Sequence, residues 1–393
     1  MKSSMKITSQ YLKPYAMKLS KSRALIIATL LFPLFSNAQD IPVFSNEFLS
    51  IGLGARGQGM GGSFIATTDD VYSLYWNPAG LSEIQEDMQI GYKHAEYFAG
   101  IANYDFGGIA IKGKDSSALA FGVIRFGVDD IANTLYLIEP DGTVNFDNIT
   151  QFSIADYAFF GSYGKQLGRL SLGGSAKVIH RRVGPFANAW GFGLDFGAKY
   201  QVSSRVKVAA MARDVTSTFN AWSITMSEED KEALQSTGNE LPENSIEITL
   251  PKLLLGVNYY QPLGTDMFLR SELGFDLFFD GQRNSLISSE IATIEPHLGV
   301  EFGFKNIFFL RGGIGNFQQE EIFDPRQSGQ VTTFQPNIGA GLKLKYVSVD
   351  YAYTDIGNAS GAPYSHLISL RFDLSKELFS SNLRKSEVEE SAE

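Results

Sequence analysis

The sequence contains no cysteine among its 393 residues. A chain without cysteine forms no disulfide framework and has no thiolate for catalysis or metal binding. Positive charge is also scarce, with 33 Lys and Arg against 43 Asp and Glu and a formal net charge of −10. Because binding to nucleic-acid phosphates needs a concentrated basic surface, this balance argues against nucleic acid as a partner.

Long apolar runs are confined to the N-terminus. Beyond it, no stretch reaches the roughly 18 apolar residues of a membrane-spanning helix, which excludes a helical membrane protein. A positively charged region, the short apolar segment Ala24–Phe35 and the small residues of Ser36-Asn37-Ala38 follow one another. This order predicts an export signal over residues 1–38, with Met1 or Met17 as the start. Its removal takes away six bases and no acid, leaving 27 bases against 43 acids.

From about Met88 to Leu374, apolar and aromatic residues alternate with other residues in segments of about ten. Alternate side chains of a β-strand lie on opposite faces, and a tilted strand crosses a membrane in about nine to eleven residues. Fourteen such segments are present: Met88–Glu96, Asn103–Lys112, Ala118–Gly127, Phe152–Gly164, Arg169–Arg182, Trp190–Gln201, Val206–Arg213, Thr249–Gln261, Met267–Phe279, Glu295–Phe304, Ile307–Gly315, Thr333–Lys345, Tyr346–Thr354 and Ser365–Leu374. They predict an all-β fold, a transmembrane antiparallel β-barrel of about 14 strands over residues 88–374.

The gaps between these segments differ in length. Gly113–Ser117 and Lys165–Gly168 are as short as tight turns, whereas Val128–Gln151 and Asp214–Ile248 are long. Outer-membrane barrels have short periplasmic turns and longer extracellular loops, so both termini are expected in the periplasm, with residues 375–393 as an acidic tail. A soluble β-sandwich shows the same alternation, but its strands are shorter and it has no reason to sort its loops by length.

Each strand should turn one face to lipid and the other to the lumen. In the sixth segment, Trp190, Phe192 and Phe196 share one face, and Asp195 lies on the other. The charged residues expected on the luminal faces are mixed in sign: Lys177, Arg181, Asp195, Lys207, Arg213, Arg270, Glu272, Asp276, Glu301, Arg311, Asp350, Arg371 and Asp373. A polar lumen accounts for all of them.

Residues 39–87 do not alternate and are expected to form a hatch inside the barrel. Gly52–Gly57 and Gly57–Gly62 both spell the dinucleotide-binding fingerprint, but neither follows a strand. Close passage of the backbone through a narrow lumen is the better explanation for these glycines. Thr68-Asp69-Asp70 can cap a short helix Val71–Trp76, which Asn77-Pro78 would end.

The hatch also resembles a known family. The segments Gly59–Ala66, Asp69-Asp70 and Tyr75–Leu81 are similar to the N-terminal signature of the PorV/PorQ family and of its wider relatives, the FadL-type transporters. The residues that carry the hatch motif are Gly59, Gly61, Gly62, Asp69, Asp70, Trp76, Asn77, Pro78 and Ala79. FadL-type barrels also have fourteen strands and a luminal hatch, so the resemblance implies an outer-membrane location.

The resemblance implies two functions. PorV-type members work with the type IX secretion system of Bacteroidetes, so this chain would bind secreted proteins or a secretion translocon. FadL-type members admit hydrophobic compounds or fatty acids, so the alternative is a channel for a hydrophobic ligand. In either case some luminal charges could latch the hatch, with Arg56, Asp69 and Asp70 as its own partners.

Catalytic chemistry finds little support. The four histidines, His94, His180, His297 and His366, are scattered over four segments, and Ser369 falls on the opposite face from His366. The sequence therefore predicts no enzyme, cofactor or metal site. The long gap Asp214–Ile248 contains Ser227 followed by acidic residues, which predicts the start of a solvated helix.

Overall fold

The computed structural model describes residues 45–98, 100–139, 141–321, 329–356 and 365–375. All of them belong to one compact unit, Pro42–Glu393. The predicted signal peptide and nearly all of the predicted acidic tail lie outside these residues. Among the described residues, no helix is long and apolar enough to cross a membrane.

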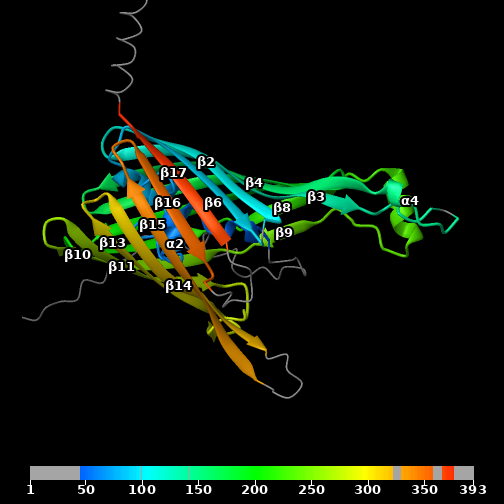
Figure 1. The fold of residues 1–393 in the computed structure, drawn as a ribbon. Helices are drawn as coiled ribbons and strands as arrows, with labels where there is room; N and C mark the ends of the chain where they lie inside the picture. The colour runs from blue at the N-terminus through cyan, green and yellow to red at the C-terminus, as the bar shows by residue number, and fades with distance from the viewer. Residues whose placement is uncertain (1–44, 99, 140, 322–328, 357–364, 376–393) are drawn as a thin grey trace, which may run out of the picture. The chain divides into compact units, whose positions relative to one another are not determined.

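Fourteen antiparallel strands close into a transmembrane barrel, which confirms the predicted fold (Figure 1). They are β1 (Met88–Tyr97), β2 (Ala102–Lys112), β3 (Ser117–Asn133), β4 (Thr150–Leu167), β5 (Leu170–Val183), β6 (Ala187–Gln201), β7 (Val206–Arg213), β10 (Lys252–Leu263), β11 (Met267–Phe278), β13 (Thr293–Phe304), β14 (Phe308–Glu321), β15 (Gln330–Lys343), β16 (Val347–Thr354) and β17 (Ser365–Leu374). Each strand pairs with the next in this order. β1 closes the ring against β17, with Met88 opposite Leu374 and Glu96 opposite His366.

The outer face of the barrel is apolar, as the alternation predicts. Trp190 and Phe196 of β6 are both 54% exposed, whereas Asp195 between them is 2% exposed. Leu310 of β14, Ile338 of β15 and other outward aliphatic side chains extend this surface around the ring. A continuous apolar exterior over a polar interior is the arrangement that lipid requires.

Two hairpins are longer than the sequence predicts. β3 continues to Asn133 and β4 begins at Thr150, although Val128–Gln151 was expected to be a loop. The pairing register shifts between Val128 and Ile131, so a β-bulge absorbs the polar residues that interrupt the alternation. β14 likewise continues beyond Gly315 after a second register shift.

The predicted loop Asp214–Ile248 is also partly strand. β8 (Thr218–Ile224) pairs with the N-terminal part of β6, and β9 (Ile246–Thr249) pairs with β8. Between these strands lies α4 (Glu228–Ser236), the expected helix, whose N-cap Ser227 forms a capping box with Asp230. The short elements η4 (Phe146–Asn148) and β12 (Ile287–Ser288) lie in other long connections.

The hatch fills the barrel with short helical turns: η2 (Glu47–Leu49), α2 (Ala55–Gly59), α3 (Ser73–Trp76) and η3 (Pro78–Glu83). α2, which lies within the glycine-rich stretch, packs against β14, β15, β16 and β17, and Figure 1 shows it inside the ring of strands. The predicted helix Val71–Trp76 is present but shorter, because α3 begins only at Ser73; it ends at Trp76, before Asn77-Pro78, as predicted. Asp70 does not cap it from the predicted position; its carboxylate accepts a hydrogen bond from the Tyr72 amide at 3.0 Å.

Glycines allow the hatch to touch the wall backbone to backbone. A Cβ added to Gly313 of β14 would lie 2.1 Å from the carbonyl carbon of Met60 and 2.2 Å from the amide nitrogen of Gly61. Gly61 also has a φ of +64°, in the region that favours glycine. This close approach is the use of glycine that the sequence suggests, and it requires glycine on both surfaces.

We expect Gly313→Ala to destabilise the folded barrel by about 1 to 3 kcal/mol, the usual cost of overpacking a filled interior. The measurement is the urea midpoint of unfolding in detergent micelles, followed by tryptophan fluorescence. Gly312→Ala is the matched control, because a Cβ on this neighbouring glycine would meet nothing within 4 Å. Equal midpoints for both variants would contradict close packing at this contact.

Candidate functional site

The hatch runs the length of the lumen. At its start, the Ser45 hydroxyl donates to Glu247 of β9 at 2.9 Å, on the side of the long connections. At its end, η3 leads into β1 near the short turns. The described part of the hatch therefore enters at the long-connection end and leaves at the short-turn end, where β17 also ends.

One buried carboxylate in the lumen contacts three arginines. Glu301 of β13 has no exposed surface and accepts bonds from Arg56 of the hatch at 3.1 Å, Arg270 of β11 at 2.8 Å and Arg311 of β14 at 2.8 Å. Arg311 also pairs with Asp350 of β16 at 2.7 Å. Since Arg56 contributes from the hatch and the others from the wall, the cluster joins the two.

A second set of ion pairs holds the next part of the hatch. Arg371 of β17 pairs with Asp70 at 3.0 Å and with Asp373 at 3.0 Å, and Arg56 pairs with Asp69 at 2.7 Å. These contacts place all three candidate latch residues in one network with the wall. With the Glu301 cluster, these contacts tie the hatch to both β13 and β17.

The two neighbouring hatch carboxyls differ in acidity. Burial alone would raise the pKa of Asp69, but the Arg56 guanidinium, with Arg270 and Lys199, holds it well below its usual range. Burial raises the pKa of Asp70, and this effect outweighs the attraction of Arg371 and Arg56. Acidification should therefore protonate Asp70 before Asp69 and weaken the bond to Arg371 first.

The remaining predicted luminal charges also face inward, and most of them bind other parts of the lumen. Lys177 pairs with Asp195 at 2.9 Å, and Arg181 pairs with Asp156 and Glu247 at 2.9 and 3.0 Å. Glu272 accepts from the Ala66 amide at 2.8 Å and from the Thr67 hydroxyl. Lys207 and Lys199 both pair with Glu83 of the hatch, at 2.7 and 3.0 Å.

The polar groups of the hatch motif hold its own fold. The Trp76 indole donates to the carbonyl of Leu53 at 2.6 Å, and the Asn77 side chain donates to the carbonyl of Ile65 at 3.1 Å. Asn77 also accepts from the Ala79 amide, which begins η3 with Pro78 in its first turn. A Cβ on Gly173 of β5 would lie 2.3 Å from the Ala79 nitrogen, so this turn packs directly on the wall.

The sequence did not reveal a hydrogen-bond chain from Ser63 through His297 to Asp276. The Ser63 hydroxyl lies 2.8 Å from His297 Nδ1, and His297 Nε2 lies 3.1 Å from Asp276. Ser63 has no exposed surface, so the chain anchors the hatch and presents no nucleophile. Its partners are far apart in the sequence, and only the inward position of His297 hinted at it.

The predicted separation of His366 from Ser369 holds, since His366 bonds Tyr351 whereas Ser369 accepts from the Ala55 amide.

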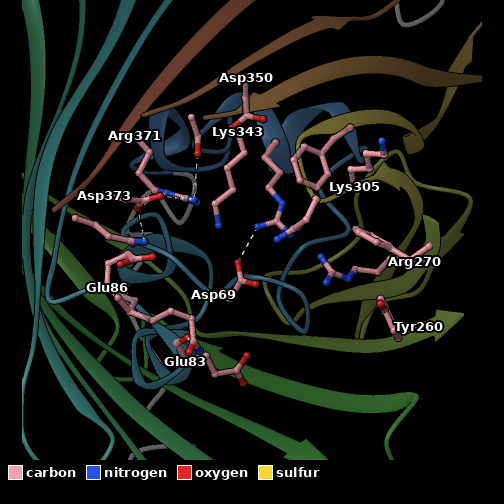
Figure 2. Close-up of a pocket in the computed structure, with 18 of the residues that line it drawn as sticks. Asp69, Glu83, Glu86, Tyr260, Arg270, Lys305, Lys343, Asp350, Arg371 and Asp373 are labelled. Carbon is pink, nitrogen blue, oxygen red and sulfur yellow. Dashed lines mark hydrogen bonds and ion pairs between the residues drawn. The ribbon is translucent and has the colours of Figure 1, made fainter. Parts of the chain in front are cut away.

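A cavity of about 1010 Å³ lies between the hatch and the short turns. Figure 2 shows the basic residues Arg270, Lys305 and Lys343 around this space together with Asp69, Glu83 and Glu86 of the hatch. Its lining is mostly charged or polar, so it forms a water-accessible chamber and is poorly suited to an apolar ligand.

Comparison with known proteins identifies solved structures that share this fold. No protein-family model matches the sequence, and no curated protein matches it. Among solved structures, the CymD monoaromatic hydrocarbon channel aligns over 83% of this chain and 98% of its own, with 14% identity and a TM-score of 0.51. The Pseudomonas putida toluene transporter TodX aligns over 85% of this chain and 100% of its own, with 13% identity and a TM-score of 0.51. The chain therefore has the fold of these channels.

We expect Asp70→Ala to raise single-channel conductance several-fold in planar bilayers, because Arg371 would lose its partner on the hatch. Asp129→Ala is the control, since its 3.1 Å pair with Arg125 is at least partly exposed and does not involve the hatch. Unchanged conductance in the Asp70 variant, with the hatch still folded, would show that this ion pair is not a latch.

Proposed function

We propose that this protein is a non-enzymatic outer-membrane channel that admits a small hydrophobic compound past a movable hatch. The observation that carries the proposal is the position of the hatch, which lies between an apolar, aromatic part of the lumen and a polar chamber. The likeness of the barrel to two channels for aromatic hydrocarbons supports this function over the secretion role that the hatch motif suggested.

The apolar side of the hatch provides surface for such a compound. Phe48, Leu49 and Leu53 belong to a buried apolar cluster, and Ile51, Tyr97 and Phe126 pack against the same cluster while remaining partly exposed. On the other side, the chamber of about 1010 Å³ begins beyond Asp69. A ligand that leaves the aromatic side would need the hatch to move before it reaches water.

Ion pairs hold the hatch in its position. One network joins Glu301 to Arg371 through Arg56 and Asp70, and Glu83 pairs with Lys199 elsewhere on the wall. Buried ion pairs fix geometry more than they add net stability. They therefore suit a plug that must hold one position and still be released.

A second candidate function is that of a shuttle that binds secreted proteins, which the resemblance to the PorV/PorQ family implies. It is favoured by the exposed apolar residues on the long β3–β4 connection, where Phe146 is 72% and Ile138 is 60% exposed. Tyr136 of this connection bonds Asp230 of α4 at 2.7 Å, so the two segments form one surface (Figure 1). Exposed apolar surface of this kind often marks a protein contact.

Locking the hatch tests the channel directly. The Ala55 amide donates to the Ser369 hydroxyl of β17 at 2.7 Å, so Ala55→Cys with Ser369→Cys would introduce two cysteines at neighbouring positions of the hatch and the wall, in a chain that otherwise has none. In cells that express this double variant, uptake of radiolabelled toluene should fall to the vector level after oxidation and recover after reduction. The two single variants are the controls. Equal uptake by the double variant before and after oxidation would contradict a moving hatch. Uptake no higher than in vector-only cells for every variant would contradict the channel.

Purification from the native membrane in mild detergent separates the two functions. We expect a bound hydrophobic compound, detected by mass spectrometry after solvent extraction. Co-purified proteins that share a C-terminal domain, and that are lost when Ile138 and Phe146 are both replaced by Ser, would instead favour the shuttle.

A further inference from the structure

A buried lysine without an acidic partner lies on the aromatic side of the hatch. Lys93 of β1 points into the lumen and has no exposed surface. Its ammonium donates to the carbonyl of Gly52 at 3.3 Å, and within the described part of the chain no carboxylate lies within ion-pair distance of it. Lys177 and Lys199, which are buried equally deeply, both pair with carboxylates.

Aromatic rings surround this ammonium group. It lies 4.0 Å from the ring centre of Tyr104 and 5.6 Å from that of Tyr97. Tyr104 packs edge-on against Tyr97 and Phe126, with ring centres 6.1 and 5.9 Å apart. Cation–π contacts compensate a buried charge only in part.

Two further donors lack acceptors at the same place. Within the described residues, the hydroxyls of Tyr97 and Tyr104 are buried and have no hydrogen-bond partner. Buried polar groups in proteins are almost always paired, because an unpaired one keeps its full cost of desolvation. The ammonium has only the Gly52 carbonyl as an acceptor and the two hydroxyls have none, so an acceptor that carries negative charge is the group that this cluster would best complement.

The site lies where the proposed route begins. Tyr97 and Phe126 are only partly buried, so the cluster is reached from the end of β1. On its inner side, the Lys93 bond to Gly52 ties it to the hatch. Lys93 and Tyr104 themselves have no exposed surface, so a ligand would reach them only when the hatch segment at Gly52 or the partly exposed ring of Tyr97 moves aside.

We propose that Lys93, Tyr97 and Tyr104 form a binding site for a small aromatic carboxylate. The carboxylate would accept hydrogen bonds from the ammonium and the two hydroxyls, and the aromatic body would pack among the three rings. This inference rests on the proposed channel function and names its substrate class. It differs from what CymD and TodX are named for, since a hydrocarbon such as toluene has no group that these donors could bind.

The test uses the full-length protein in nanodiscs and benzoate as the probe, with isothermal titration calorimetry at neutral pH. Lys93→Met should weaken benzoate binding about tenfold or more, because a charge-assisted hydrogen bond is lost. Tyr104→Phe should weaken it by a smaller factor, since one neutral donor is lost. Lys165→Met, at the far end of β4, controls for a change in overall charge and should leave binding unchanged.

Several results would overturn the assignment. They are benzoate binding that is absent in the wild type, binding that is equal in the wild type and Lys93→Met, or tighter binding of decanoate than of benzoate. Uptake of toluene by the same variants separates this inference from the channel itself. If toluene enters normally while the affinity for benzoate is unchanged by Lys93→Met, only this inference fails. If toluene does not enter and benzoate does not bind, the proposed function fails as well.

Discussion

The structure depends on one constraint, that no backbone polar group facing lipid can be left without a hydrogen bond. Within hydrocarbon there is no water to pair such a group, so a sheet must close on itself. The pairing of β1 with β17 over the full register from Met88 to Glu96 meets this requirement. β7 and β8 both pair with β6, and in the gap between them the Val215 amide donates to the carbonyl of Leu194 in β6 at 2.9 Å.

Closure then creates a second requirement inside. A ring of strands that alternate strictly presents half of its side chains to a narrow lumen, and many of these are charged. The hatch supplies their partners: Glu301 finds Arg56, Arg371 finds Asp70, and Glu272 finds the Ala66 amide. The hatch therefore pairs with charged groups of the lumen. If the hatch leaves, water from the polar chamber must take its place as the partner of these groups.

Much of the barrel could be predicted from the sequence, because strand alternation is local and repeats fourteen times. β8 and β9 were missed because they are short and follow polar interruptions. The partners of the hatch could not be predicted, since Asp70 and Arg371 are 301 residues apart and nothing in either neighbourhood identifies the other. Lys93 is not among the luminal charges predicted from the sequence. In the described part of the structure, Lys93 bonds a backbone carbonyl, whereas Lys177 pairs with a carboxylate.

The contact between Asp70 and Arg371 also fixes an order of assembly. Asp70 lies in the segment that precedes the first strand, whereas Arg371 lies in the last strand to be synthesised. Contacts between residues so distant in the chain form late, because the intervening loop must first be closed. The hatch therefore cannot reach its final position until β17 has joined β1. A barrel arrested one strand short of closure would leave its glycine-rich N-terminal segment unanchored on this side, and the docked hatch is thus a mark of completed insertion.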